Sequence, residues 1–510
     1  MRYGHFDDDA REYVVTTPHT PYPWINYLGS QEFFSLISHQ AGGYSFYRDA
    51  KMRRLTRYRY NNVPADAGGR YFYVNDGGDV WTPSWMPVKA DLDHFETRHG
   101  LGYTRISGRR RGVRVDTLYF VPVGENAEVQ KVTVTNTSDE AKSLTVFSFA
   151  EFCLWNAQDD QTNYQRNLSI GEVEVETDGP HGAAIYHRTE YRERRNHYAV
   201  YGVNASVAGF DTDRDTFVGA YNSLGEAAVP RAGRSADSVA SGWYPIASHS
   251  LAVDLAPGES RSYTFVLGYI ENPDEEKWAD DAHQVINKER AHALLGRFAT
   301  EEQTDAAFTE LRRYWTDLLS TYSVRSTDEK LDRMVNIWNQ YQCMVTFNMS
   351  RSASFFETGI GRGMGFRDSN QDLLGFVHLI PERARERILD ILLPDSRHAP
   401  ARPAFVAATP VEDSSGETRE KLGKWLDEGR LEEREVEVDV KEQSFPSFEI
   451  FTPQGVEEMG VNVKDMLPGL FGGRSKRKKM RLGEAREVLI AEEAEKLVDQ
   501  QNVAKEAVDR

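Results

Sequence analysis

The aromatic residues are concentrated in the first four-fifths of the chain, and this uneven distribution constrains the fold most. The 510 residues include 9 Trp, 24 Tyr and 25 Phe, yet only six aromatic residues lie beyond residue 400. No tyrosine follows Tyr341. A change in composition this sharp indicates domains of different origin. The sequence therefore predicts an aromatic-rich body that can bury a large core, followed by a separate C-terminal segment.

Charge, cysteine content and the N-terminal residues exclude several classes of protein. The formal net charge of −18 argues against a nucleic-acid partner or an anionic membrane surface. No run approaches the roughly 18 apolar residues that a membrane span needs. Cys153 and Cys343 are far apart and form no CxxC motif, which predicts a reduced cytoplasmic protein rather than a disulfide scaffold. The opening residues MRYGHFDDDARE are not typical of a signal peptide.

Strand patterns dominate the first half of the chain. Residues 114–121 and 262–270 alternate β-branched or aromatic residues with polar ones, which predicts strands. Residues 128–136 and 143–152 flank a turn-rich segment and predict a β-hairpin. Because many short strands occur without helices between them, the pattern favours a β-sandwich over a parallel sheet.

Helical patterns follow after residue 272. Residues 274–298 are rich in Glu, Lys and Ala, and residues 301–322 place large apolar side chains on one face, so both segments predict helices. Residues 326–329 (STDE) form a candidate capping box. Residues 381–392 predict a further helix with proline in its first turn. The helix after the capping box carries a stripe that we expect to be core, namely Leu331, Met334, Trp338, Tyr341 and Val345.

Several tryptophans and one histidine have both a structural and a functional interpretation. Trp24, Trp81, Trp85 and Trp155 could stack on sugar rings, whose axial C–H faces suit a π surface, but core packing is the commoner role. His378 lies inside the apolar run GFVHLI. A histidine in such a run is more often a buried structural residue than a catalytic base.

Residues 351–375 (RSASFFETGIGRGMGFRDSNQDLLG) combine three arginines, three acids and two amides with five glycines. The alternating glycines allow the backbone to approach a ligand closely. Arginine forks match phosphate oxygens, and carboxylates accept hydrogen bonds from sugar hydroxyls. The residues alone support two interpretations equally, a site for a sugar together with a phosphate or a surface loop with ion pairs.

This stretch resembles the arginine/aspartate loop of the inverting glycoside phosphorylases, most closely those that act on cellobiose. The likeness extends from residue 1 to about residue 390 and includes the opening MRYGHFDDDAREYVVTTPHTPYPWINYLG, residues 45–64 and the segment TNYQRN. It implies a β-sandwich over residues 1–272, a helical linker over residues 273–325, and the first helices of an incomplete (α/α)₆ barrel over residues 326–393.

The resemblance also implies a reaction and site residues. The reaction is phosphorolysis of a β-1,4-glucosyl disaccharide to α-glucose 1-phosphate and glucose with inversion, with inorganic phosphate as co-substrate and neither cofactor nor metal. Asp368 and Arg362 match donor-sugar positions, and Arg351 and Arg362 match phosphate positions. Gln165 matches a residue that reaches the acceptor subsite across a homodimer formed through the sandwich.

The family's general acid has no counterpart in this sequence. That acid belongs to an Asp-Asp-Pro-Leu-Trp motif beyond the arginine loop, and no such motif occurs in the chain. Phosphate is already a nucleophile, but the departing sugar oxygen needs a proton from an acid whose pKa is tuned upward. We therefore assign no catalytic residue and expect the chain to be inactive. A carbohydrate-binding or dimerising sandwich without catalysis is the alternative.

The last part of the chain has a different character. A Pro/Ala-rich linker over residues 394–416 precedes a charged α+β segment over residues 417–510. FEIFTPQGVEEM, VNVKDMLPGLFGG and LIAEEAEKLVD resemble the inserted domain of the HslU-type ATPase subunit of an ATP-dependent protease. No G-x-x-x-x-G-K-[ST] motif occurs, so ATP hydrolysis is not expected, and binding of a protein partner is the third possible function. We expect the basic residues 474–481 to be a solvated face.

Two incomplete resemblances in succession predict a chimeric reading frame. Its origin is an assembly error, a genomic fusion or an engineered fusion. Continuous coverage of the source DNA across codons 385–400 would establish a real fusion rather than an assembly error.

Overall fold

The structure is a computed structural model that describes most of the N-terminal part and short pieces of the C-terminal part. The chain divides into two compact units, Met1–Ile380 and Pro381–Arg510. The described residues are 3–29, 32–59, 68–162, 171–189, 196–242, 244–349, 353–360, 365–392, 420–425, 428, 430, 435–441 and 475–481.

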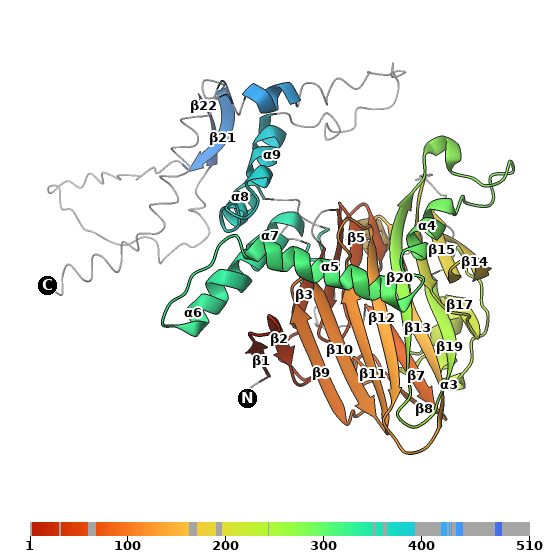
Figure 1. Cartoon of the computed structure of the whole chain (residues 1–510). Helices are drawn as coiled ribbons and strands as arrows, with labels where there is room; N and C mark the ends of the chain where they lie inside the picture. The colour runs from red at the N-terminus through yellow and green to blue at the C-terminus, as the bar shows by residue number, and fades with distance from the viewer. Residues whose placement is uncertain are drawn as a thin grey trace, which may run out of the picture. The chain divides into compact units, whose positions relative to one another are not determined.

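An eleven-stranded antiparallel sheet forms one layer of the N-terminal unit, in the order β1-β2-β9-β10-β11-β12-β20-β16-β15-β14-β18 (Figure 1). The strands predicted over residues 114–121 and 262–270 are present as β11 and β20. In chain order the strands are β1 (Gly4–Asp7), β2 (Glu12–Val15), β9 (His94–Gly100), β10 (Tyr103–Arg110), β11 (Val113–Phe120), β12 (Ala127–Asn136), β14 (Gly171–Gly179), β15 (Gly182–Thr189), β16 (His197–Val203), β18 (Ser241–Gly242) and β20 (Ser260–Glu271).

A second antiparallel sheet forms the other layer, in the order β17-β19-β13-β6-β5-β4-β3, with β7 pairing both β13 and β8. Its strands are β3 (Ile25–Leu28), β4 (Phe33–Ser38), β5 (Ser45–Tyr47), β6 (Arg54–Thr56), β7 (Arg70–Asp76), β8 (Asp79–Trp81), β13 (Lys142–Trp155), β17 (Gly209–Asp213) and β19 (Pro245–Leu255). Buried side chains of both sheets, such as Val115, Val132, Phe147 and Phe149, form one apolar core. The predicted β-sandwich is therefore confirmed.

The hairpin predicted for residues 128–152 is wrong, although both of its strands exist. β12 pairs with β11 and β20, whereas β13 pairs with β7, β6 and β19 in the other sheet. The chain crosses between layers after Asn136, whose Nδ2 donates to the carbonyls of Glu140 (2.8 Å) and Leu255 (3.2 Å). Alternation shows that each segment can bury one face, but it does not identify which strand lies beside it.

Helices occur mainly after the sandwich. The helices are α1 (Ala157–Thr162), α2 (Arg214–Val218), the 3₁₀ helix η2 (Leu224–Glu226), α3 (Ala228–Ala232), the 3₁₀ helix η3 (Asp274–Glu276), α4 (Glu289–Gly296), α5 (Glu301–Leu319), α6 (Glu329–Arg333), the π-helix η4 (Met334–Trp338), α7 (Asn339–Met349), α8 (Phe366–Leu374) and α9 (Pro381–Leu392).

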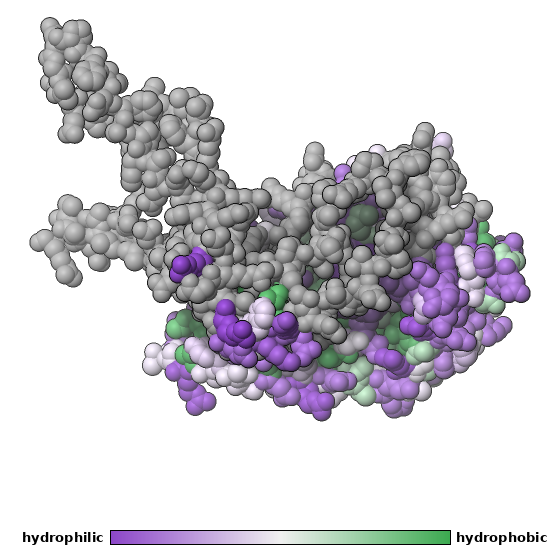
Figure 2. All heavy atoms as spheres, turned by 90° about the horizontal axis from the view of Figure 1, so that it is seen from above, coloured by the Kyte–Doolittle hydropathy of each residue, from purple (hydrophilic) through white to green (hydrophobic). Residues whose placement is uncertain are grey.

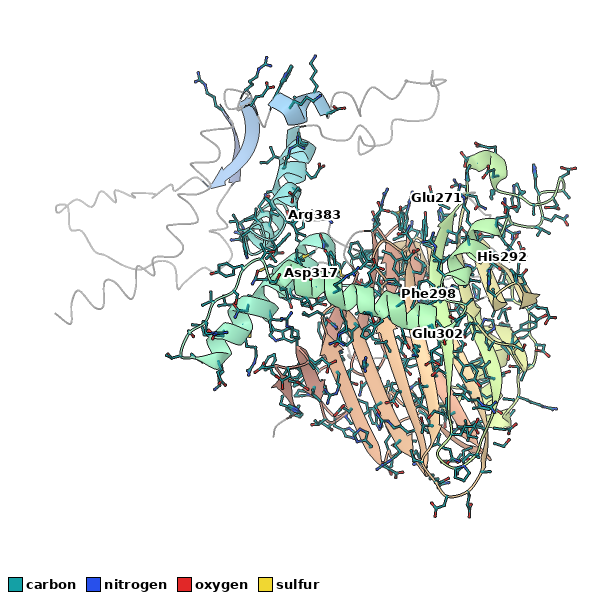
Figure 3. All side chains as sticks on the ribbon, viewed as in Figure 1. Glu271, His292, Phe298, Glu302, Asp317 and Arg383 are labelled. Atoms are coloured by element: carbon teal, nitrogen blue, oxygen red, sulfur yellow. The ribbon has the colours of Figure 1, made fainter. Side chains whose placement is uncertain are left out.

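Helix α5 lies across the outer face of the eleven-stranded sheet, and Glu302 and Asp317 lie near its two ends (Figures 1 and 3). A complete capping box starts this helix, because Thr300 accepts from the backbone N–H of Gln303 and the Gln303 side chain accepts in return. The Phe308 ring packs on strands of the sheet, with its centroid 5.0 Å from that of Tyr103. The helix predicted over residues 301–322 is thereby confirmed and covers apolar sheet surface.

The helix predicted over residues 274–298 is present only as η3 and α4. Between them the chain makes an isolated β-bridge from Trp278 to Ile286. The Asp280 side chain accepts from the backbone N–H groups of Gln284 (2.9 Å) and Val285 (2.8 Å). Aspartate that bonds nearby backbone in this way stabilises turns in competition with helix, which composition alone did not indicate.

The expected core stripe after the capping box is only half buried. Asp328, not Ser326, caps α6 by accepting from the N–H groups of Lys330 and Leu331. Met334–Trp338 then forms a π-helix, which changes the angular spacing of the following residues. Tyr341 and Val345 in α7 are buried, whereas Leu331 is 50% exposed and Met334 is 38% exposed.

The C-terminal unit contains the predicted helix α9 and a two-stranded sheet. β21 (Glu435–Lys441) pairs antiparallel with β22 (Ser475–Arg481). The register places acidic Glu437 and Asp439 opposite basic Lys479 and Arg477. The basic run is thus a strand beside an acidic one, a pairing that the sequence pattern did not reveal.

None of the helices in the described ranges is both long enough and apolar enough to span a membrane. Hydrophilic residues predominate on the described part of the face seen from above, where hydrophobic residues form only small patches (Figure 2). Cys153 is buried and Cys343 is half-buried, and neither forms a disulfide bond in the described part of the chain.

Candidate functional site

The arginine- and glycine-rich segment runs into helix α8, which presents Asp368. Asp368 lies in the first turn of α8, and its side chain is 43% exposed. A carboxylate in the first turn is stabilised by the partial positive charge at the helix N-terminus. Gly365 precedes the helix, and a Cβ there would lie only 2.7 Å from Asp368 Oδ2. The glycine therefore leaves space for the carboxylate at the position expected for a donor-sugar acceptor.

Three sandwich side chains hold the first half of this segment through its backbone. The Tyr44 hydroxyl donates to the carbonyl of Ser354 (3.0 Å), and the Tyr58 hydroxyl donates to that of Phe355 (2.7 Å). The Arg54 guanidinium donates to the carbonyl of Thr358. We call Tyr44, Arg54 and Tyr58 the sandwich clamp, because each binds a carbonyl about 300 positions further along the chain.

Burial makes the sandwich clamp effective. Arg54 is fully buried, and its Cζ lies 3.9 Å from the centroid of the Tyr44 ring. Burial raises the pKa of Tyr44 well above its ordinary value, so the hydroxyl stays protonated and can donate. The two tyrosines of the clamp belong to a second apolar cluster, which contains Phe34, Leu36, Tyr44, Phe46, Ala50, Tyr58, Met349, Ala353 and Phe355.

The backbone at the end of the clamped segment adopts a left-handed conformation. Thr358 has φ of 61° and Gly359 has φ of 68°. A Cβ on Gly359 would lie 2.7 Å from the Cβ of Ala50 in the sandwich. Gly359 thus has the positive φ that the glycine pattern predicted, but its close approach is to Ala50 of the sandwich rather than to a ligand.

Gly359→Ala is expected to lower the free energy of unfolding by about 2–4 kcal/mol, since it adds a steric clash to the cost of left-handed backbone. Gly258→Ala is the matched control, because Gly258 has φ of 75° with no atom within 4 Å of the added Cβ. It is expected to lose only about 1–2 kcal/mol. Chemical denaturation of both variants measures the difference, and equal losses would show that contact with Ala50 is unimportant.

A buried ionic network holds helix α1, which ends three positions before Gln165. Asp160 accepts from Arg57 Nε at 2.8 Å and from Arg59 Nη2 at 3.0 Å. Burial alone would raise the pKa of Asp160, but the Arg57 guanidinium outweighs that effect and the pKa lies below its ordinary value. Glu151 pairs with the same arginine at 2.8 Å. This network fixes the start of the segment in which the acceptor-subsite residue was predicted.

Only some of the residues predicted to be functional lie in the described part of the chain. Asp368 is described, whereas Arg351, Arg362 and Gln165 lie outside the described residues. His378 is exposed rather than buried, and its Nε2 lies 2.8 Å from Gln340 Oε1. The structure therefore describes the position of one of the four predicted site residues.

Sequence analysis missed the sandwich clamp. Arg54 and Tyr58 lie within residues 45–64, which carried the family resemblance, but no local pattern indicates that they contact residues 354–358. The available signal was that residues 45–64 are rich in tyrosine and arginine but have no matching run of acids. This composition indicates that the arginines bind groups other than nearby carboxylates, but it does not identify those groups.

The described residues thus form a two-layer β-sandwich followed by helices, with an aspartate-bearing segment clamped to the sandwich. The chain belongs to the glycosyl hydrolase 94 family. The supersandwich domain of that family matches residues 11–301, and its superfamily catalytic domain matches residues 314–423.

The curated relatives include enzymes named for different disaccharides. The N,N'-diacetylchitobiose phosphorylase of Vibrio proteolyticus is 34% identical over 401 residues, which cover 77% of this chain and 47% of that protein. The solabiose phosphorylase of Paenibacillus borealis is 25% identical over 397 residues, covering 76% and 47% respectively. The chain thus spans about half the length of these relatives.

A relative of another kind matches a different share of the chain. The ATP-dependent protease ATPase subunit HslU of Magnetococcus marinus is 43% identical over 141 residues, which cover 25% of this chain and 30% of that protein. The chain therefore joins a glycosyl hydrolase 94 part to a part similar to HslU. The predicted chimeric organisation is supported.

Proposed function

We propose that this chain derives from an inverting disaccharide phosphorylase and binds a β-linked glucosyl sugar without completing phosphorolysis. The observation that carries the proposal is Asp368, held in the first turn of α8 at the end of a segment clamped by the sandwich. Arg362 supplies a second donor-sugar contact and, with Arg351, the phosphate contacts. These roles follow from the family resemblance.

The missing reaction step is protonation of the leaving oxygen. In inverting phosphorolysis, phosphate attacks the anomeric carbon from one face while the glycosidic C–O bond breaks on the other. The departing sugar alkoxide is too basic to leave readily without a proton, and a positioned acid contributes about 10²–10⁴-fold to such steps. The 510 residues contain no Asp-Asp-Pro-Leu-Trp motif to supply that acid.

We propose cellobiose as the disaccharide, on the resemblance of residues 45–64 and 351–375 to cellobiose-acting members of the family. The relatives above carry names of other disaccharides, so specificity varies within the family. The proposal includes a cytoplasmic homodimer through the sandwich, in which Gln165 reaches the neighbouring subunit's acceptor subsite.

Calorimetric titration of the full chain with cellobiose, glucose and N,N'-diacetylchitobiose tests the proposal. Asp368→Asn is expected to weaken cellobiose binding about tenfold or more, because a hydrogen bond to a charged group contributes about 1.5–3 kcal/mol. Asp317→Asn on exposed α5 is the control and should leave the affinity unchanged. Identical titrations of wild type and Asp368→Asn would contradict the assignment of Asp368.

A second candidate function concerns the C-terminal part. Its similarity to HslU favours binding of a protein partner, without ATP hydrolysis. Pull-down of an HslU-partner protease by the full chain tests this candidate. Equal recovery with a variant lacking residues 417–510 would contradict it.

A further inference from the structure

A cavity of about 480 Å³ lies between the N-terminal strands and the first helices after α5, and none of the described residues that line it belongs to the 351–375 segment. This volume is in the range of small-molecule sites. No lining residue carries a formal charge. Six of the eleven lining residues are aromatic: Phe6, Tyr13, Trp24, Tyr27, Trp338 and Tyr341.

Four of these aromatic rings form a continuous band that is partly exposed to solvent. The Phe6 centroid lies 4.8 Å from that of Tyr13 and 5.7 Å from that of Trp338. Tyr13 in turn lies 5.4 Å from Trp24. Phe6 is 36% exposed, and the other three rings are half-buried. Core packing alone would hide such rings, as it hides Trp81 and Trp155, which are each 1% exposed.

Helix geometry provides an independent indication of function. Trp338 ends the π-helix Met334–Trp338, and single π-turns inside α-helices occur frequently at functional sites. Arg333, just before that turn, lies 4.7 Å from the Phe6 ring centroid and pairs with Asp8. The wall of the cavity is therefore held in place by an ion pair that does not itself line the cavity.

The polar groups on the floor are neutral and already bonded within the protein. Asn26 donates to the carbonyls of Gly100 and Tyr103 at 2.8 Å and accepts from the Tyr341 hydroxyl at 3.1 Å. Burial lowers the pKa of His99 to about 3, so its imidazole is neutral. The exposed Gln342 at the rim has an amide that can both donate to and accept from a hydroxyl.

We propose that this cavity is a separate carbohydrate site that binds an uncharged pyranose ring. The apolar C–H face of the sugar stacks on Trp338 and Phe6, and its hydroxyls bond the Gln342 amide. Anions are disfavoured, because no cation lines the cavity. The site shares no residue with the 351–375 segment, so it goes beyond the proposed function and does not depend on it.

Saturation-transfer NMR and calorimetry of the full chain with methyl β-D-glucopyranoside test the site. Trp338→Ala is expected to weaken binding about tenfold, the effect of losing one aromatic stacking partner. Gln342→Ala, at an exposed position that leaves folding intact, is expected to weaken it several-fold. Trp278→Ala, a half-buried tryptophan outside the cavity, should leave this binding step unchanged, whereas Asp368→Asn should affect only a separate step at the donor-sugar position.

The outcomes separate the two sugar sites. A binding step that is lost in Trp338→Ala or Gln342→Ala but remains in Asp368→Asn supports the cavity. Equal affinity in wild type and Gln342→Ala, or loss only in Asp368→Asn, overturns it. Should Trp338→Ala fail to fold by circular dichroism, Gln342→Ala alone decides. If Asp368→Asn binds cellobiose as tightly as wild type, the proposed function is contradicted, but the cavity site is not.

Discussion

Glu128→Ala is expected to lower the free energy of unfolding of the N-terminal unit by about 3–5 kcal/mol. Glu128 and Arg70 are both completely buried, and the two oxygens of the carboxylate accept from Arg70 Nε and Nη2 at 2.9 Å each. Ser35 and Gln130 also donate to this carboxylate. Removing it leaves a guanidinium inside the sandwich without a counter-charge, and chemical denaturation measures the loss.

Glu259→Ala is the matched control for this prediction. Glu259 pairs with Arg261 at 3.2 Å, but both side chains are well exposed to solvent. Water screens this exposed pair, so the control should lose far less stability than Glu128→Ala. Similar losses in the two variants would show that the buried pair does not stabilise the sandwich as argued.

A glucoside with an acidic leaving group is expected to react at least about 10²-fold faster than cellobiose in the presence of phosphate. Dinitrophenolate leaves without protonation, so dinitrophenyl β-D-glucoside needs no general acid and tests the proposed donor-sugar and phosphate contacts alone. Absorbance of the released dinitrophenolate measures the rate, with a phosphate-free reaction as control. Equal rates for the two substrates would mean that an acid is present.

Local periodicity was sufficient to predict individual elements. Alternation predicted β11 and β20, an apolar face predicted α5, and proline in a first turn predicted α9. The pairing of strands depends on residues that are distant in the sequence. The predicted hairpin over residues 128–152 was therefore wrong. The π-turn at Met334–Trp338 shows the same limit, because no sequence spacing indicated the change in helix geometry that exposes part of the stripe.

Residues of the candidate site could be predicted only where they belong to a recognisable sequence motif. The motif identified Asp368, but the sandwich clamp depends on contacts across some 300 positions, which only the folded chain reveals. The tryptophans show why residue type is not enough. Trp81 and Trp155 are core, whereas Trp24 lines an open cavity. Trp338 lines the same cavity, although the sequence pattern predicted it to be part of a core stripe.

Direct measurement of α-glucose 1-phosphate, formed from cellobiose and inorganic phosphate by the purified full chain, tests the central claim most directly. We predict no product above a protein-free reaction, in a sample whose calorimetric titration shows that it binds cellobiose. Turnover in the ordinary enzymatic range of about 1–10³ s⁻¹ would contradict the claim, because it would require a proton donor that we have not found in this sequence.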